Sequence, residues 1–252
     1  MTALLEGKVV IATGAGSGIG QETALKLAAE GALVAVADID LPAARSTVEL
    51  VEAAGGRAIP VQVDVTDSAS VEAMVATTVA EFGRVDGAFN NAGIGGPDGP
   101  IAAHSEDGWA RVIAVNLTGV FLCLKHELAY FQSRPGGGAI VNTSSVGGLI
   151  GVPTQAAYSA SKHGVLGLTK TAAAEYGEIG VRVNAVCPGI VATAGTKALI
   201  PEEVQAMLLA GIPAKRMAEP AEVAAAVAYL LSDEASYLTG VALPVDGGLI
   251  VL

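Results

Sequence analysis

The chain has 252 residues, of which 52% are hydrophobic and 15% charged, and its formal net charge is −11. A length of one to two domains without a proline-rich, serine-rich or charged linker predicts a single domain over residues 1–252. Its lysines and arginines stand singly, so the chain lacks the basic stripe that a phosphate backbone requires. We therefore expect no nucleic-acid partner.

The compartment is inferred from cysteines and apolar segments. Cys123 and Cys187 lie in apolar surroundings and form no ligand-spaced set with the histidines, which favours buried thiols, a reducing compartment and no metal site. The longest charge-free stretch, residues 135–161, contains six glycines and two prolines, which is unlike a membrane helix. The N-terminal segment lacks the basic start of a signal peptide. A cytoplasmic enzyme with no membrane partner is the resulting expectation.

Short runs rich in β-branched residues alternate with longer segments at helical period. The first strand, 8–13, precedes a helix to about residue 30, and the second strand, 33–37, precedes a helix to about residue 54. Further strands are predicted at residues 58–63, 85–90, 139–143, 181–186 and 241–245. Strands that are apolar throughout and alternate with helices predict an α/β fold, with a doubly wound parallel sheet of seven strands and helices on both faces.

Unusual residues follow these strands directly. Open parallel sheets bind ligands beyond the carboxyl ends of their strands, where the strand order reverses. The segments found there are TGAGSGIG (13–20), Asp38, Asp64-Val65, NNAG (90–93), Ser144-Ser145 and Pro188-Gly189. We therefore expect the functional site at this edge of the sheet.

The first of these segments is a glycine-rich turn between a strand and a helix. Gly14, Gly18 and Gly20 permit a tight turn that brings backbone N–H groups and the helix N-terminus against a pyrophosphate. The spacing is GxxxGxG, because Ile19 stands where the third glycine of GxGxxG would be. A purely structural glycine turn is the alternative.

Asp38 ends the second strand, 18 residues after Gly20. A carboxylate there can accept hydrogen bonds from both ribose hydroxyls and repel a 2′-phosphate. Ser17 and Ile39 offer no cation to neutralise such a phosphate, so the predicted cofactor is NAD (NADH) rather than NADP. The alternative is an Asx turn or a helix cap, although Asp40 is the better candidate for the cap.

Tyr158 and Lys162 lie four residues apart on a predicted helix and so project from one face. A nearby ammonium would lower the pKa of the phenol toward the working range of a general acid or base. Ser145 follows a strand at the same sheet edge and could hydrogen-bond the reacting oxygen, although turn chemistry alone also explains it.

With these residues the chain resembles the short-chain dehydrogenase/reductase family over nearly its whole length. The matching stations, in order, are TGAGSGIG at 13–20, Asp64-Val65, NNAG at 90–93, Asn116, Ser145, YSASK at 158–162, PGIVAT at 188–193 and VDGG at 245–248. The resemblance implies a Rossmann-type fold and a hydride transfer between NAD(H) and a secondary alcohol or ketone.

The resemblance also implies roles for individual residues. The catalytic tetrad would be Asn116, Ser145, Tyr158 and Lys162, with Tyr158 as general acid or base. Tyr158 would supply the polarisation that a metal gives elsewhere, so no metal is expected. The implied cofactor-binding residues are Gly14, Ser17, Gly18, Ile19, Gly20, Asp38, Ile39, Asp64, Val65, Asn90, Asn91, Ala92, Gly93, Tyr158, Lys162, Pro188, Gly189, Ile190 and Thr193.

Some of these roles are specific. By resemblance, Asp64 and Val65 flank the adenine, Asn90 lines the cofactor channel, and Ile190 with Thr193 holds the nicotinamide carboxamide. Asn116 lies in a predicted long helix, where its ordinary role would be bonding to nearby backbone. The resemblance instead implies that it positions a water linking Lys162 to solvent.

Substrate contacts are expected from residues 94–105, from 146–155 and from the segment after Thr193. That segment, about 194–217, is either a small lid or a packed surface helix, with an apolar side through Leu199, Met207 and Leu208. The predicted substrate residues are Ser145, Leu149, Val152 and Tyr158. An apolar lining that also includes Ile94 and Ile150 favours a compact, alicyclic alcohol or ketone.

Two other functions remain open. A reductase of carrier-protein-bound β-ketoacyl chains would need basic residues and NADPH, and a non-catalytic NAD-sensing module would be expected to lack Tyr158 or Lys162.

The resemblance further implies a homotetramer, with a homodimer as the alternative. Helices containing VIAVNLTGVFLCL and GVLGLTKTAAA, and the C-terminal GLIVL, are apolar around more of their surface than one sheet contact buries.

Overall fold

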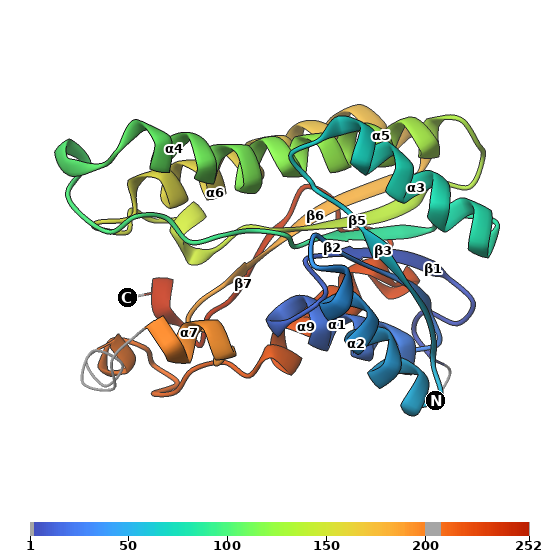
Figure 1. Ribbon diagram of the computed structural model, residues 1–252, viewed down its shortest axis with the longest axis horizontal. Helices are drawn as coiled ribbons and strands as arrows, with labels where there is room; N and C mark the ends of the chain where they lie inside the picture. Colours follow the sequence, from blue (N-terminus) through green and yellow to red (C-terminus); the bar gives the residue numbers. More distant parts are fainter. Residues whose placement is uncertain (1–2, 200–207, 252) are drawn as a thin grey trace.

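The computed structural model describes residues 3–199 and 208–251. Its centre is a seven-stranded parallel sheet in the order β3-β2-β1-β4-β5-β6-β7, with a layer of helices on each face (Figure 1). The strands are β1 Val9–Thr13, β2 Leu33–Asp38, β3 Arg57–Gln62, β4 Gly87–Asn90, β5 Gly138–Thr143, β6 Val181–Pro188 and β7 Ala242–Val245. The predicted fold class is confirmed, and it is of the Rossmann type.

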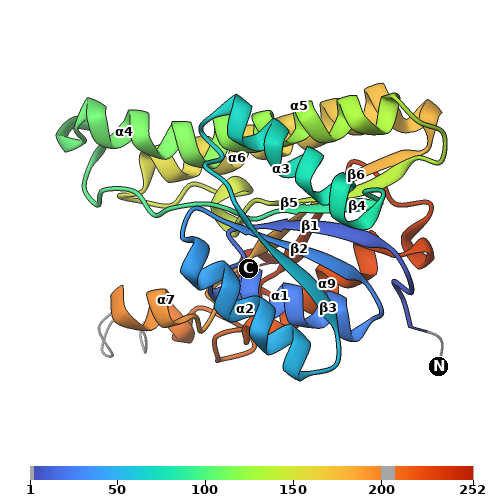
Figure 2. The same cartoon turned by 45° about the vertical axis from the view of Figure 1, so that its right-hand side comes forward.

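The two helical layers are seen in both views (Figures 1 and 2). One layer consists of α1 Gly18–Ala29, α2 Leu41–Ala53 and α9 Pro220–Leu231. The other consists of α3 Ser68–Phe82, α4 Glu106–Ile113, α5 Gly119–Gln132 and α6 Ala156–Tyr176. Further helical pieces are α7 Ala194–Leu199, a π-helical turn Ala114–Thr118, and short 3-10 turns at Ile101–Ala103, Val146–Gly148, Gly177–Ile179, Asp233–Ala235 and Leu249–Val251.

The apolar strands are buried on both faces, as their sequences predict. In β1, Val10 and Ala12 join the core cluster beneath α1 and α9, whereas Ile11 joins the cluster beneath α3, α5 and α6. In β2, Val34 and Ala35 divide in the same way. Side chains alternate across a strand, so only a continuous apolar run can fill both layers.

Helix ends follow local chemistry. The Asp40 side chain accepts from Ala43 N at 3.2 Å and caps α2, while Asp67 accepts from Ala69 N at 3.1 Å and caps α3. Gly83 ends α3 with a left-handed φ of +82°, which glycine adopts without a Cβ clash. The cap expected at Asp40 is therefore present, and Asp38 does not cap α2.

The strand order reverses between β1 and β4, because the chain builds outward from β1 through β2 and β3 and then returns to β4. A crevice beyond the carboxyl ends of β1 and β4 is the expected ligand site of such a sheet. The glycine-rich turn and NNAG follow these two strands, so the topology brings them together.

The helical run Glu106–Gln132 is interrupted by the π-helical turn that carries Asn116. By length and composition the run could cross a membrane, and half of its most apolar window is buried inside the fold. The predicted lid begins with α7, and Met207 lies outside the described residues.

Candidate active site

The glycine-rich turn is shaped by close backbone contacts. Gly14 and Gly18 have φ angles of +60° and +56°, a region that side chains disfavour. A Cβ at Gly20 would lie 2.1 Å from the carbonyl oxygen of Gly14, and a Cβ at Gly16 would lie 2.9 Å from Asp38 Oδ2. Glycine is therefore required for the turn itself, whatever the turn binds.

Asn91 fixes this turn to the neighbouring strand. Its Nδ2 donates to the carbonyl oxygens of Thr13 and Gly14, both at 3.2 Å, and its Oδ1 accepts from Thr143 Oγ1 at 3.3 Å. A Cβ at Gly14 would lie 2.8 Å from Ala92 Cα. The NNAG segment thus supports the turn from behind and leaves its open side toward the crevice.

The open side of the turn fits a phosphate. Ser17 is the N-cap of α1, but its side chain makes no capping hydrogen bond. A Cβ at Gly18 would meet only Thr193 within 4 Å, at 3.4 Å, so the space above the first turn is walled by the segment after β6. Unpaired N–H groups at a helix N-terminus attract anions, and the arrangement can hold a pyrophosphate. Ile19 instead packs against the core.

Asp38 faces the glycine-rich turn. Its Oδ2 accepts from Gly16 N at 2.8 Å and its Oδ1 accepts from Asp40 N at 3.0 Å, which is the Asx-type bond considered as the alternative. Each carboxylate oxygen can accept a further hydrogen bond, so this arrangement leaves room for ribose hydroxyls. Ile39 is 65% exposed beside it and offers an apolar surface.

The residues predicted to flank the adenine, Asp64 and Val65, follow the end of β3. Asp64 Oδ1 accepts from Thr66 N and Thr66 Oγ1, so this side chain shapes its own turn. Val65 is buried, and a Cβ at Gly119 would lie 2.8 Å from its Cγ2. Val65 thereby holds the start of α5 close to the crevice.

Tyr158, Ser145 and Val152 converge at Gly147. A Cβ there would lie 3.5 Å from both Ser145 Oγ and Tyr158 Cε1, and 3.2 Å from Val152 Cγ2. Ser145 Oγ accepts from Gly147 N at 3.1 Å, so the hydroxyl proton of Ser145 stays free to donate. The predicted reacting residues and one predicted substrate contact therefore share one small space.

Lys162 is buried below Tyr158. Its Nζ donates to the carbonyl oxygen of Thr143 at 2.8 Å and lies 5.6 Å from the centroid of the Tyr158 ring. Ser144 Oγ donates to the Lys162 carbonyl oxygen at 2.9 Å, which fastens α6 to the end of β5. The strand end and the helix thus position the ammonium together.

The expected lowering of the pKa of Tyr158 is wrong for this arrangement. Burial raises the pKa of the phenol, and a hydrogen bond with Ser145 offsets part of that rise. Burial also lowers the pKa of Lys162 to about 8, against the opposing effect of Cys187. Desolvation disfavours the charged form of both groups, and the Lys162 ammonium is committed to a backbone carbonyl.

Asn116 is buried in the π-helical turn and bonds to backbone at long range. Its Nδ2 donates to the Ile94 carbonyl oxygen and its Oδ1 accepts from Ile94 N, both at 2.8 Å. A Cβ at Gly93 would lie 3.3 Å from Asn116 Oδ1 and 3.6 Å from Lys162 Nζ. Gly93 therefore lets these two side chains approach, and Asn116 orders the loop after NNAG.

The side chain of Asn90, which the resemblance expects to line the cofactor channel, forms hydrogen bonds inside the core. Its Nδ2 donates to Glu127 Oε2 at 2.9 Å and to Asn142 Oδ1 at 3.1 Å. Glu127, on α5, is fully buried, and burial raises its pKa to about 7. Sequence analysis missed Glu127; the available signal was one carboxylate inside an otherwise apolar helical face.

The segment after β6 closes the other side of the crevice. The Ile190 carbonyl oxygen accepts from Ala218 N at 2.9 Å, and Thr193 Oγ1 accepts from Thr196 N at 3.1 Å, which caps α7. Pro188 is buried at the end of β6, and a Cβ at Gly189 would lie 3.0 Å from Asp246 Cα. An isolated β-bridge between Val191 and Ala218, just before α9, thus holds the segment of the predicted carboxamide residues.

Two of the predicted lining residues differ in exposure. Leu149 packs against the small core cluster of Leu166, Ala185 and Cys187, so part of its side chain is taken up by the core. Ile150 is 43% exposed. Val152 is the predicted apolar contact that the geometry brings closest to Tyr158 and Ser145.

A family model described as enoyl-(acyl carrier protein) reductase matches residues 14–250. Levodione reductase of Leifsonia aquatica is 43% identical over 251 residues, 96% of this chain and 93% of that protein. Cyclohexanol dehydrogenase of Acinetobacter sp. (strain SE19) is 46% identical over 240 residues, 95% of this chain and 94% of that protein.

A second relative and a crystal structure are also similar to this chain. The 3-oxoacyl-[acyl-carrier-protein] reductase of Thermotoga maritima (strain ATCC 43589 / DSM 3109 / JCM 10099 / NBRC 100826 / MSB8) is 43% identical over 247 residues, 98% of this chain and 99% of that protein. The crystal structure of levodione reductase matches with a TM-score of 0.92 at 41% identity, covering 97% of this chain and 98% of that chain. The chain belongs to the short-chain dehydrogenase/reductase family.

This short-chain dehydrogenase/reductase is an oxidoreductase that acts on CH–OH groups, interconverting secondary alcohols and ketones with a nicotinamide cofactor. Among the described residues, no group of three or more His, Cys, Asp and Glu side chains could hold a metal ion.

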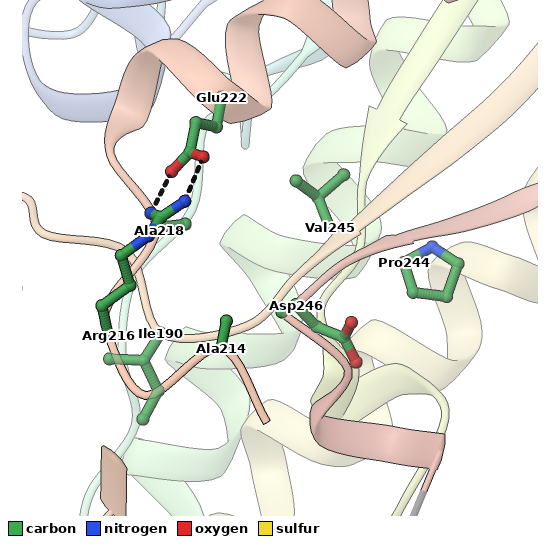
Figure 3. A pocket seen from close by; sticks show the side chains of 9 residues that line it. Ile190, Ala214, Arg216, Ala218, Glu222, Pro244, Val245 and Asp246 are labelled. Carbon is green, nitrogen blue, oxygen red and sulfur yellow. Dashed lines mark hydrogen bonds and ion pairs between the residues drawn. The ribbon is translucent and has the colours of Figure 1, made fainter. Parts of the chain in front are cut away.

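A cavity of about 240 Å³ adjoins the Ile190 segment of this short-chain dehydrogenase/reductase (Figure 3). Arg216 and Glu222 face each other across its rim in a two-bonded ion pair, with both N···O distances at 2.6 Å. Asp246 accepts from Gly248 N and Ile250 N and so caps the C-terminal turn. The charged side chains of this cavity already have partners within the protein.

Proposed function

We propose that the protein is an NAD(H)-dependent dehydrogenase/reductase of compact, alicyclic secondary alcohols and ketones. The observation that carries the cofactor choice is Asp38, whose carboxylate is held against the glycine-rich turn by Gly16 N at 2.8 Å. A 2′-phosphate at this position would meet a negative charge, and neither Ser17 nor Ile39 supplies a cation to pair with it.

A nicotinamide cofactor held at this crevice would supply or accept the hydride. Tyr158 gives a proton to the ketone oxygen in reduction and takes the hydroxyl proton in oxidation, acting as general acid and base. Ser145 donates its free hydroxyl proton to the same oxygen and fixes its position. The Lys162 ammonium stabilises negative charge as it develops on Tyr158, and the Thr143 carbonyl oxygen holds it in place.

Asn116 takes part by positioning. Its paired bonds to Ile94 hold the loop after NNAG against Lys162, and a water on the same side would link the ammonium to solvent. The cofactor residues named from the sequence, Asn90 among them, remain our proposal.

The substrate class rests on the lining and on one relative's name. Val152 places apolar surface beside the space that Ser145 and Tyr158 share, which favours a hydrocarbon ring over a charged or polyhydroxylated substrate. A relative with 46% identity is named cyclohexanol dehydrogenase, and this supports an alicyclic substrate.

A second candidate is a reductase of carrier-bound 3-oxoacyl chains, favoured by the 43% identity to a protein of that name. An acidic carrier would be repelled by a chain of net charge −11. We therefore rank this function below the first.

We also propose a homotetramer, with a homodimer as the alternative, in the cytoplasm. Trp109 and Phe121 are 44% and 48% exposed on the α4–α5 side, and Val251 is 76% exposed near the C-terminus, as surfaces covered by another copy would be. Sedimentation showing only a monomer at micromolar concentration would contradict the proposed homotetramer and homodimer.

Within the single domain, we propose residues 194–217 as a lid.

The cofactor proposal is tested by the ratio of kcat/KM with NADH to that with NADPH. Asp38→Ser with Ile39→Arg removes the repulsion and adds a guanidinium that can pair with phosphate, so the preference should invert. Loss of charge-assisted bonds of about 1.5 to 3 kcal/mol corresponds to roughly 10- to 150-fold in binding. An unchanged ratio in a folded double variant would remove Asp38 from the cofactor site.

A further inference from the structure

A cluster of hydrogen bonds joins the loop after β4 to the turn that precedes α6. Asp98 Oδ1 accepts from Thr154 Oγ1 at 3.2 Å and from the Gln155 side-chain amide. Gly99 N donates to the Thr154 carbonyl oxygen at 3.2 Å. His104 Nε2 lies 2.7 Å from the Gly99 carbonyl oxygen and 3.1 Å from that of Thr154. We call these five residues the clasp.

The role of His104 follows from its partners. Carbonyl oxygens only accept hydrogen bonds, so Nε2 carries the proton and shares it between two carbonyls. Within the described part of the chain, the buried Nδ1 of His104 has no hydrogen-bond partner. The ring is therefore a donor that ties the backbone of Gly99 to that of Thr154.

Thr154 is held in a strained backbone conformation. Its φ is +69°, and in the described ranges it shares a positive φ with only one other non-glycine residue, Lys215. A β-branched residue avoids this region, and such strain persists where the surroundings over-determine the conformation. The hydroxyl and the carbonyl of Thr154 are both bonded within the clasp, which supplies that constraint.

The clasp reaches the catalytic helix directly. Gln155 is the N-cap residue of α6, but its side chain bonds to Asp98 instead of capping the helix. In the same loop, a Cβ at Gly96 would lie 3.9 Å from Tyr158 N and 3.8 Å from Gln155 Oε1. The loop after β4 therefore lies across the first turn of α6, which carries Tyr158.

We propose that Asp98 and His104 are positioning residues that set the place of Tyr158 relative to the substrate loop 94–105. The inference rests on the proposed function, because it assumes that a ketone lies between this loop and Tyr158. A fixed distance between Tyr158 and the loop 94–105 makes the site fit one compact ring. A ketone that binds out of place would not receive the proton of Tyr158. Small misplacements of reacting groups are costly, since proximity and orientation supply much of the rate.

The first test compares Asp98→Ala with Asp98→Asn and with Asp107→Ala, a matched loss of charge at an exposed position on the first turn of α4. Asp98→Ala should lower kcat for a cyclic ketone by about 10-fold, while KM for NADH stays within about twofold. Asp98→Asn keeps an acceptor oxygen for Thr154 and Gln155 and should return kcat to within about twofold of wild type. Asp107→Ala should behave as wild type.

A double-mutant cycle then asks whether Asp98 and Gln155 act as a unit. If they do, Asp98→Ala with Gln155→Ala should be no slower than the slower single variant. Hydrogen exchange without substrate gives a measure that does not depend on activity: amides of residues 154–158 should exchange faster in Asp98→Ala than in Asp107→Ala.

The proposal is overturned by any of three kinetic results: wild-type kcat in Asp98→Ala, equal losses in Asp98→Ala and Asp98→Asn, or single effects that multiply in the double variant. Unchanged exchange at residues 154–158 also overturns it. If the wild-type protein reduces no ketone, the proposed function fails, and the exchange experiment alone decides whether the clasp holds α6.

Discussion

Tyr158 and Lys162 show how a single residue's burial changes its ionisation. Their spacing in the sequence predicts a common helix face, and the 5.6 Å between Lys162 Nζ and the Tyr158 ring confirms that they are close. Spacing does not reveal that Lys162 donates to the Thr143 carbonyl oxygen, or that desolvation raises the pKa of Tyr158 more than its hydrogen bond with Ser145 lowers it. Tyr158 therefore remains protonated at neutral pH, which suits it to protonate a ketone oxygen.

Replacing Tyr158 by Phe tests this assignment. The ring stays but the proton donor is lost, so turnover should fall by roughly 10²- to 10⁴-fold with NADH affinity nearly unchanged. The role of Tyr158 as base or acid fixes the sign of the pH dependence: oxidation needs deprotonated Tyr158 and should accelerate as pH rises, whereas reduction should slow at alkaline pH. The raised pKa of Tyr158 moves both changes to higher pH. Stopped-flow rates across pH measure both, and wild-type turnover in the variant would assign the proton transfer to another group.

Glu127 gives a prediction for stability. Burial raises the pKa of its carboxyl from 4.5 to about 7, so the folded protein holds this proton more tightly than the unfolded chain. Stability should therefore fall as pH rises from about 4.5 to about 7 and then level off, by up to roughly 3 kcal/mol. Glu127→Gln keeps an acceptor for Asn90 and cannot ionise. Urea unfolding should show less pH dependence in this variant, and identical profiles would contradict the assignment.

At the scale of elements, the sequence predicts the pieces that local rules determine. Strand starts and ends agree with the structure to within two residues, because apolar runs and flanking turns define them, and the cap Asp40 is predicted from its residue type. The π-helical turn at Asn116 and the inward direction of Asn90 depend on Ile94 and Glu127, partners 22 and 37 residues away. Contacts at such separations leave no local pattern.

The glycine-rich turn offers a test of one element. Gly20→Ala would place a Cβ 2.1 Å from the Gly14 carbonyl oxygen, so the turn must open and the first turn of α1 must move. We expect NADH affinity to fall by at least about 10-fold, together with a lower Tm. Gly177→Ala is the matched control, because no atom lies within 4 Å of its Cβ position and its φ is −60°. Equal NADH titrations in the two variants would contradict the assigned role of the turn.

For the whole molecule, the alternation of strands and helices was sufficient to predict the sheet, and the topology then gathers the site at one edge. Four strands lead into the site: they are followed by the glycine-rich turn, NNAG, Ser145 and the segment after β6. These segments converge because the carboxyl ends of parallel strands lie at the same edge of the sheet. The sequence could name these residues but not the clasp, whose members Asp98, His104 and Thr154 resemble ordinary loop residues until the fold brings them together.

The most direct test of the central claim is the initial rate of NADH oxidation by the wild-type protein with cyclohexanone and, in parallel, with an acetoacetyl thioester. The proposed function predicts a kcat/KM for the cyclic ketone at least about 10-fold above that for the thioester, because the lining is apolar and the chain is acidic. A higher kcat/KM for the thioester, or no NADH oxidation with either compound, would contradict the account.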